Sequence, residues 1–223
     1  MNPPAQSVLV VVAHPDDAEL AMGMQMLDHA RVGDRVRVHC LTTGRPEDSD
    51  IRRSECMAAA KILGVTDYTF SAIPDTRFAE HRTQINNNLF TVFAENRPDV
   101  VYTHFPDDQH LDHAITGEEA TTVSLREVNN LIYFRSPYSR NFEPNRFFTG
   151  TRDLLSAKEA ALRCFTSQEQ LDMEVFRDLT AIGYRQHVHH RVVERFPDNT
   201  HGAEMFRTGR QVIHASAPPH PMP

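Results

Sequence analysis

Two short polar clusters contain the residue types that metal-dependent hydrolysis needs. The first is Ala13-His14-Pro15-Asp16-Asp17, which directly follows the apolar run at residues 8–12. The second is Pro106-Asp107-Asp108-Gln109-His110-Leu111-Asp112-His113, which follows a further apolar run at residues 100–102. Imidazoles and carboxylates in this mixture can supply the three protein ligands, the open coordination position and the spare carboxylate of a catalytic zinc site.

The expected place of each residue assigns it a role at such a metal. A residue at a strand end points into the crevice beyond the sheet, so His14 can reach an ion bound there. Asp17 lies in the first turn of the following helix and can add an anionic oxygen, and His113 comes from the neighbouring strand-end loop. These three ligands leave a coordination position for water, whose pKa zinc lowers to about 7.

Three further polar residues are left for proton transfer. Asp16 is not needed as a ligand and is predicted to be the general base. His110 is predicted to carry a proton to the leaving group or to bond the developing oxyanion, and Asp112 to orient His110. The competing interpretation gives the aspartates a structural role, because aspartate commonly caps the free N–H groups of a helix start. It leaves the histidines unexplained.

The hydrophobic pattern predicts a scaffold that brings the two strand ends together. Apolar runs of strand length alternate with helical periods, which is typical of a parallel sheet with helices on its faces. The predicted strands are residues 7–12, 35–41, 67–70, 99–103 and 131–134. The predicted helices are residues 19–31, 52–63, 83–96 and 115–127. We therefore expect an α/β fold with a Rossmann-like, mostly parallel sheet.

The pattern weakens after about residue 135. Residues 141–145 are interpreted as a loop, two more helices are predicted at 154–164 and 171–183, and residues 186–202 show no regular period. We expect one domain over residues 1–214 and a disordered, proline-rich tail at 215–223.

Composition narrows the class of protein. The chain has 223 residues, of which 40% are hydrophobic and 24% charged, values that suit one globular core. A formal net charge of −7 argues against nucleic acid and anionic membranes as partners. Three cysteines without a CxxC pair predict reduced thiols, and no apolar run has the length of a membrane span or signal peptide. A cytoplasmic location is expected.

Other histidines and arginines receive no functional role from the sequence. The histidines at 187, 189 and 190 are interpreted as part of an exposed loop. Three arginines after the last predicted strand are interpreted as surface residues, although they could bind substrate hydroxyls or a phosphate: Arg135, Arg140 and Arg146.

The two clusters resemble those of the LmbE-like, or phosphatidylinositol-glycan-L-like, deacetylases. Softer matches at residues 52–64, 73–75, 97–101 and 166–168 extend the likeness over most of residues 7–206. The resemblance implies a zinc enzyme that removes an N-acetyl group from a small-molecule N-acetylamino-sugar conjugate. The roles that it implies for the two clusters agree with those assigned above for His14, Asp16, Asp17, His110, Asp112 and His113.

The resemblance also implies roles in substrate binding. Arg52 stands where the family has an arginine that binds sugar hydroxyls, and Asp75 corresponds to a residue at the substrate rim. One departure concerns the substrate, because family members commonly carry a Gly-Gly pair where this chain keeps only Gly23 among methionines. An amidase for a larger acyl group or a thiol-conjugate amide, and a non-catalytic metal- or sugar-binding module, are the alternatives. The choice between Zn²⁺ and Fe²⁺ and the state of homo-oligomerisation stay open.

Overall fold

A computed structural model describes residues 4–168, 171, 176, 177, 180, 181, 183 and 200–213. The predicted tail, the three histidines at 187, 189 and 190, and most of the helix predicted at 171–183 lie outside the described residues. Within the described part, no helix is both long and apolar enough to cross a membrane.

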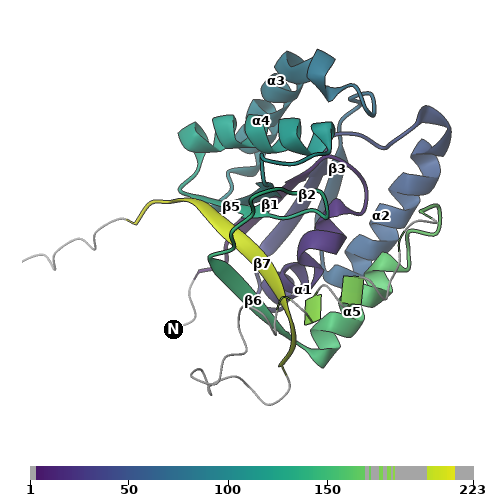
Figure 1. Ribbon diagram of the computed structural model, residues 1–223, viewed down its shortest axis with the longest axis vertical. Helices are drawn as coiled ribbons and strands as arrows, with labels where there is room; N and C mark the ends of the chain where they lie inside the picture. The colour runs from purple at the N-terminus through teal and green to yellow at the C-terminus, as the bar shows by residue number, and fades with distance from the viewer. Residues whose placement is uncertain are drawn as a thin grey trace, which may run out of the picture.

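A seven-stranded sheet forms the centre of the described residues, in the order β3-β2-β1-β4-β5-β7-β6 (Figure 1). Its parallel strands are β1 (Ser7–Val12), β2 (Arg35–Cys40), β3 (Asp67–Phe70), β4 (Val100–His104) and β5 (Asn130–Phe134). Two antiparallel strands extend it beyond β5, namely β7 (Thr200–Gln211) and then β6 (Arg146–Thr151).

Helices cover both faces of the sheet. One face carries α1 (Asp17–Arg31), α2 (Ser49–Leu63) and α5 (Arg152–Leu162). The other carries α3 (Arg82–Asn96) and α4 (Leu111–Glu127). Two short 3₁₀ helices, η1 (Pro46–Asp48) and η2 (Phe78–His81), lie in the loops before α2 and α3.

Strand β1 belongs to both hydrophobic cores. Val8, Val10 and Val12 pack in the core under α1 and α2, whereas Leu9 and Val11 pack in the core under α3 and α4. Successive side chains of a strand point to opposite faces, so a strand covered on both sides needs a continuous apolar run. This is why β1 reads as an unbroken run of aliphatic residues.

The strand order reverses between β1 and β4. The chain moves from β1 to β2 and β3 on one side, then returns to place β4 on the other side of β1. In open α/β sheets, such a reversal leaves a crevice beyond the carboxyl ends of the two strands, where ligands bind. The loop after β1 contains the first polar cluster, and the loop after β4 contains the second.

The predicted fold class is confirmed, and the five parallel strands lie within one residue of their predicted bounds. The prediction missed β6 and β7, and α5 begins and ends two residues earlier than predicted. Both missed strands are antiparallel strands at one end of the sheet. Much of their length is only partly buried, and the sequences RFFTGT and THGAEMFRTGRQ lack the aliphatic run of a doubly covered strand.

Candidate metal centre

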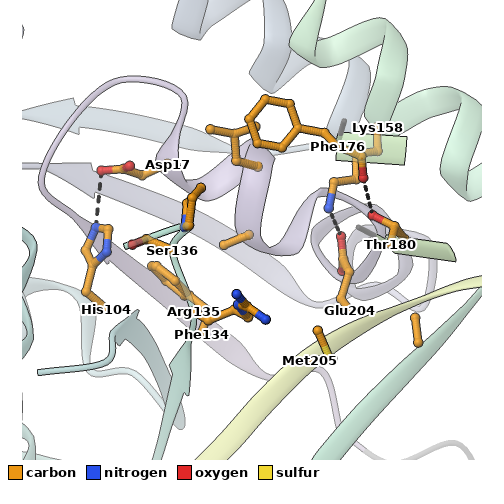
Figure 2. Close-up of a pocket in the computed structure, with 14 residues that line it drawn as sticks. Asp17, His104, Phe134, Arg135, Ser136, Lys158, Phe176, Thr180, Glu204 and Met205 are labelled. Carbon is orange, nitrogen blue, oxygen red and sulfur yellow. Dashed lines mark hydrogen bonds and ion pairs between the residues drawn. The ribbon is translucent and has the colours of Figure 1, made fainter. Parts of the chain in front are cut away.

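The Asp17 carboxylate links the ends of the two central strands. Its Oδ2 accepts a hydrogen bond from the backbone N–H of His14 (2.8 Å) and lies 3.2 Å from Nε2 of His104, the last residue of β4 (Figure 2). Asp16 has a φ of 91°, a left-handed conformation that aspartate adopts more readily than most residues. The turn between β1 and α1 is therefore tight enough for Asp17 to bond back to the strand end.

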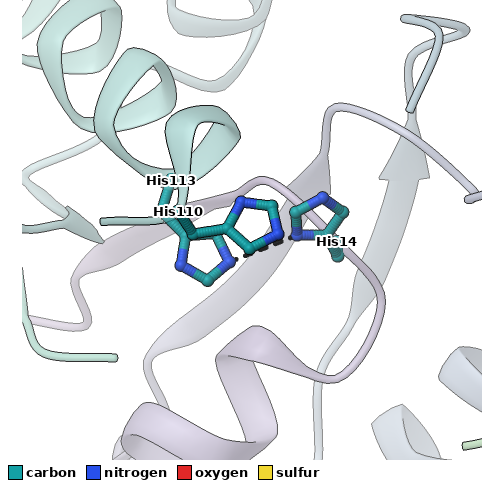
Figure 3. Close-up of side chains that lie close together, drawn as sticks. All are labelled: His14, His110 and His113. Carbon is teal, nitrogen blue, oxygen red and sulfur yellow. Dashed lines mark hydrogen bonds between the residues drawn. The ribbon is translucent and has the colours of Figure 1, made fainter. Parts of the chain in front are cut away.

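The three predicted ligands converge on one point. His14 Nδ1 lies 3.2 Å from His113 Nε2 and 3.5 Å from Asp17 Oδ2, and His113 Nε2 lies 3.4 Å from Asp17 Oδ1 (Figure 3). Ligand atoms about 2.0–2.1 Å from a tetrahedral zinc lie about 3.3–3.4 Å from one another. The three separations are close to this value, with Oδ2 of Asp17 nearest His14 and Oδ1 nearest His113, and the donor types suit Zn²⁺ or Fe²⁺.

The charge around these imidazoles also favours a cation. Burial opposes protonation of His113, but the carboxylates of Asp17 and Asp108 raise its pKa to about 9. Burial likewise opposes protonation of His14, yet bonds to Asp112, Asp17 and Asp75 raise its pKa well above the usual value. Several carboxylates thus stabilise positive charge at the point where the ligands meet.

Asp16 lies beside these ligands and is almost fully buried. Burial and the negative charge of Asp17 raise the pKa of Asp16 to about 7, against the opposing influence of Arg52. The Arg52 guanidinium lies 3.6 Å from Asp16 Oδ2 and 3.4 Å from the carbonyl oxygen of Pro15. A carboxylate with a pKa near neutral pH is suited to general-base chemistry.

His110 and Asp112 lie at the site but have different partners from those predicted. The His110 ring stacks on His113 at 4.3 Å between centroids, and its buried Nδ1 has no hydrogen-bond partner among the described residues. Asp112 Oδ2 accepts the backbone N–H of Thr76 (2.8 Å) and lies 3.5 Å from His14 Nε2. These contacts suit Asp112 for orienting His14, whereas the sequence analysis assigned it to His110.

Asp75 also contacts His14, with Oδ1 3.3 Å from Nε2. Its side chain is 26% exposed, so one edge faces solvent while the other holds the imidazole. This position is compatible with the predicted place at the substrate rim.

His104 is a site residue that the sequence analysis missed. Its Nε2 lies 3.2 Å both from Asp17 Oδ2 and from the backbone nitrogen of Ala13, and its ring stacks on His113 at 4.2 Å. Burial and the charge of His113 lower the pKa of His104 to about 4, so this imidazole stays neutral. His104 ends β4 much as His14 follows the end of β1, and this equivalent position was the sequence signal for it. The predicted strand ended at residue 103, so His104 was not considered a strand-end residue.

The described residues offer overlapping sets of metal ligands. In each set, one donor atom per residue lies within 4.8 Å of the others. The sets are His14/His110/His113, Asp17/His104/His113 and His14/Asp75/Asp112.

Asp108 supports His113 from behind. Its Oδ2 accepts the hydroxyls of Ser136 (2.6 Å) and Ser139 (2.8 Å), and its Oδ1 accepts the backbone N–H of His110 (2.8 Å). Asp108 Oδ1 lies 3.6 Å from His113 Nδ1. Burial alone would raise the pKa of Asp108, but these hydrogen bonds hold it well below its usual range. The carboxylate is therefore ionised and can orient the imidazole, an arrangement common behind metal-binding histidines.

Residues 9–124 match the family described as "PIG-L: GlcNAc-PI de-N-acetylase". The match covers more than half of the chain, and the protein belongs to this family. The predicted resemblance is confirmed.

Relatives in this family have more than one activity. The chain is 28% identical over 166 residues to an uncharacterised deacetylase, YaiS, of Escherichia coli K12, covering 71% of this chain and 89% of the relative. It is also 28% identical over 209 residues to 4-oxalmesaconate hydratase of Pseudomonas putida KT2440, covering 77% of each chain. The family therefore includes deacetylases and a hydratase.

Solved structures share the fold over nearly the whole chain. N,N′-diacetylchitobiose deacetylase from Pyrococcus horikoshii superposes with a TM-score of 0.72 at 22% identity, covering 93% of this chain and 85% of that one. 4-carboxy-2-hydroxymuconate hydratase from Pseudomonas putida KT2440 superposes with a TM-score of 0.77 at 24% identity, covering 96% and 100%. Structural similarity at 22% and 24% sequence identity establishes the fold. It does not establish the reaction, which has to be inferred from the residues of the site.

Proposed function

We propose that this protein is a metal-dependent hydrolase that removes an N-acetyl group from an N-acetylamino-sugar conjugate. The observation that carries the proposal is the close approach of His14, Asp17 and His113, whose nearest nitrogen and oxygen atoms lie 3.2, 3.5 and 3.4 Å apart, beside a buried carboxylate whose pKa is about 7. The family description, a de-N-acetylase, supports the acetyl group and the amino sugar. When bound by these three residues, Zn²⁺ would lower the pKa of a coordinated water to about 7 and polarise the acyl carbonyl.

Asp16 is the proposed general base. It takes a proton from the attacking water, which its pKa of about 7 allows near neutral pH. Arg52 lies close enough to stabilise the ionised form of Asp16 before the reaction.

His110 is the proposed acid and oxyanion group. Its ring stacks on His113 and forms an edge contact with His14, 4.8 Å between centroids, so it faces the same reaction centre. From there it can donate a hydrogen bond to the carbonyl oxygen as negative charge develops, or a proton to the leaving nitrogen.

Arg52 and Asp75 are the proposed contacts for sugar hydroxyls. The Arg52 side chain is 12% exposed and its guanidinium lies beside Asp16, so it borders the reaction centre. Asp75 offers a partly exposed carboxylate on the other side of His14.

A second candidate function is hydration of a carbon–carbon double bond. The relative that favours it is named as a hydratase, and its alignment covers 77% of both chains. The same carboxylate would serve, because adding water to an activated alkene also requires a base for the attacking water.

Acetate release from a panel of N-acetylglucosamine conjugates by zinc-loaded protein tests the proposal. Asp16→Asn should keep its zinc and lower kcat by about a hundredfold or more, as expected for a lost general base. Asp50→Asn, an exposed aspartate in α2, is the matched control and should leave the rate unchanged. An unchanged kcat in Asp16→Asn would remove Asp16 from this role.

A parallel ultraviolet assay with unsaturated carboxylic acids separates the two candidates. No acetate release from zinc-loaded protein, together with loss of alkene absorbance, would replace the deacetylase by a hydratase. If both assays fail while zinc is bound, a larger acyl group or a non-catalytic module becomes the better interpretation.

A further inference from the structure

A cavity of about 90 Å³ shares Asp17 and His104 with the candidate metal centre (Figure 2). Asp17 and His104 form part of its wall, whereas His14, His110 and His113 do not. The cavity continues between α1, the end of β5, α5 and β7. The cavity is therefore a neighbour of the metal centre, with Asp17 and His104 in the wall between them.

Most of the wall is apolar. Its apolar members include Leu20, Ala21, Phe134, Phe176 and Met205. A cavity of about 150 Å³ holds benzene, so a volume somewhat over half of that suits a group of a few non-hydrogen atoms.

A buried lysine lies at the end of this cavity, opposite Asp17 (Figure 2). The Lys158 side chain is 4% exposed, and its Nζ donates to Glu204 Oε1 at 2.8 Å. An ammonium has three N–H donors, and Glu204 is its one hydrogen-bond acceptor among the described residues. Two donors of a buried cation are thus available on the cavity side.

Glu204 has little capacity left for a ligand. Its two oxygens also accept the backbone N–H groups of Met24 and Gln25, each at 2.9 Å. These groups follow Met22, where α1 departs from helical geometry. The carboxylate therefore bonds the kinked helix as well as the lysine.

The sequence of α1 also makes room for Lys158. A Cβ added at Gly23 would lie 2.9 Å from Lys158 Cγ, so a side chain there would displace the lysine stem. An ion pair that only joins α5 to β7 would explain Lys158 and Glu204 by themselves. It does not explain a second cation on the same wall.

That second cation is Arg135, which directly follows β5 and also lines the cavity. Figure 2 shows its guanidinium extending from the side of Phe134 toward the side of the Lys158–Glu204 pair. Arg135 is exposed, and among the described residues it has no hydrogen-bond or ion-pair partner. The charged side chains of the wall are thus two cations, Lys158 and Arg135, and two carboxylates, Glu204 and Asp17.

We propose that this cavity binds a carboxylate group of the substrate, held by Arg135 and Lys158. Guanidinium and ammonium donors form strong, charge-assisted hydrogen bonds with carboxylates. The inference rests on the proposed function, because it takes the cavity as part of the active site that Asp17 helps to form. A phosphate monoester is the less favoured anion, since its second negative charge would add to the repulsion from Asp17 and Glu204 in the same wall.

The test is calorimetric titration of zinc-loaded protein with butanoate and with butanamide, its neutral isostere. Butanoate should bind at least about tenfold more tightly, since a hydrogen bond to a charged group is worth about 1.5–3 kcal/mol. Arg135→Gln should weaken this preference, with Lys158 supplying what remains. Arg140→Gln is the matched control, because Arg140 lies in the same loop and pairs instead with Asp107.

Three results would overturn the proposal. Equal binding of butanoate and butanamide would mean that the cavity accepts a neutral group. A preference retained both in Arg135→Gln and in the Lys158→Met/Glu204→Gln variant would place the carboxylate outside this cavity. Tighter binding of methyl phosphate than of butanoate would replace the carboxylate by a phosphate. Because each readout is binding, failure here is independent of whether acetate is released.

Lys158 needs a paired variant. Lys158→Met alone leaves Glu204 buried without its cation, so Lys158→Met is combined with Glu204→Gln. The double variant should weaken butanoate binding by about tenfold or more and leave butanamide binding within twofold. Unchanged butanoate binding would remove Lys158 from the site. Circular dichroism establishes that the double variant is folded, and if it is not, Arg135→Gln decides the matter.

Discussion

The two sides of Asp17 differ in their charged groups. On one side, the carboxylates of Asp75, Asp108 and Asp112 surround imidazoles and favour a cation. On the other, a largely apolar cavity is lined by Lys158 with its partner Glu204 and by Arg135, where we propose that an anion binds. Asp17 lies between the two groups of charged side chains, so the carboxylates at the metal centre are kept apart from the cations of the cavity. We infer from this difference that the reaction takes place at the metal centre and that the cavity selects the substrate.

The largest expected effect comes from removing a ligand on the metal side. His14→Ala should lose its zinc, because it deletes one corner of the ligand triangle and leaves only two protein donors. Elemental analysis after dialysis measures the change, with His81→Ala, a histidine of η2 away from the site, as control. A full zinc complement in His14→Ala would contradict the ligand assignment.

The next effect concerns the buried ion pair on the cavity side. Glu204→Gln leaves the Lys158 ammonium without its carboxylate, which should lower the free energy of unfolding by about 3 kcal/mol or more. Urea unfolding measures the loss, and adding Lys158→Met should recover part of it. Zinc affinity should not change in Glu204→Gln, and a large change would show that the two sides are not separate.

A smaller effect is expected behind His113. Asp108→Asn should weaken zinc binding about 10- to 100-fold, because the carboxylate that orients the imidazole loses its charge. Competition with a chelator measures the affinity. Asp107→Asn is a neighbouring control, since the Asp107 carboxylate pairs with Arg140 and Asn141 outside the site. Equal affinities in the two variants would leave Asp108 with a role only in the loop.

Some of this arrangement could be predicted from the sequence. The strands β1 and β4 are continuous apolar runs, and each is followed at once by polar residues. Strand ends of a parallel sheet meet at one edge, so the meeting of His14, Asp17 and His113 followed from local pattern plus a general rule of topology. Their role as ligands stays a proposal.

Other parts of the site could not be predicted in this way. Asp112 was paired with His110 because the two are neighbours in sequence, yet its carboxylate bonds Thr76 and lies against His14. Only the path of the loop before η2 brings Thr76 there. Arg135 was interpreted as a surface arginine, and it is exposed, but only the tertiary structure shows that it borders a cavity.

The sequence by itself determined the family, the parallel part of the sheet and the two polar clusters, because each rests on neighbouring residues or on a short period. The tertiary structure decided the cavity, whose parts come from distant segments. Glu204 bonds Met24 across 180 positions of the chain and Lys158 across 46. Contacts over such separations depend on how β7 pairs and where α1 bends, and no local pattern encodes either of these.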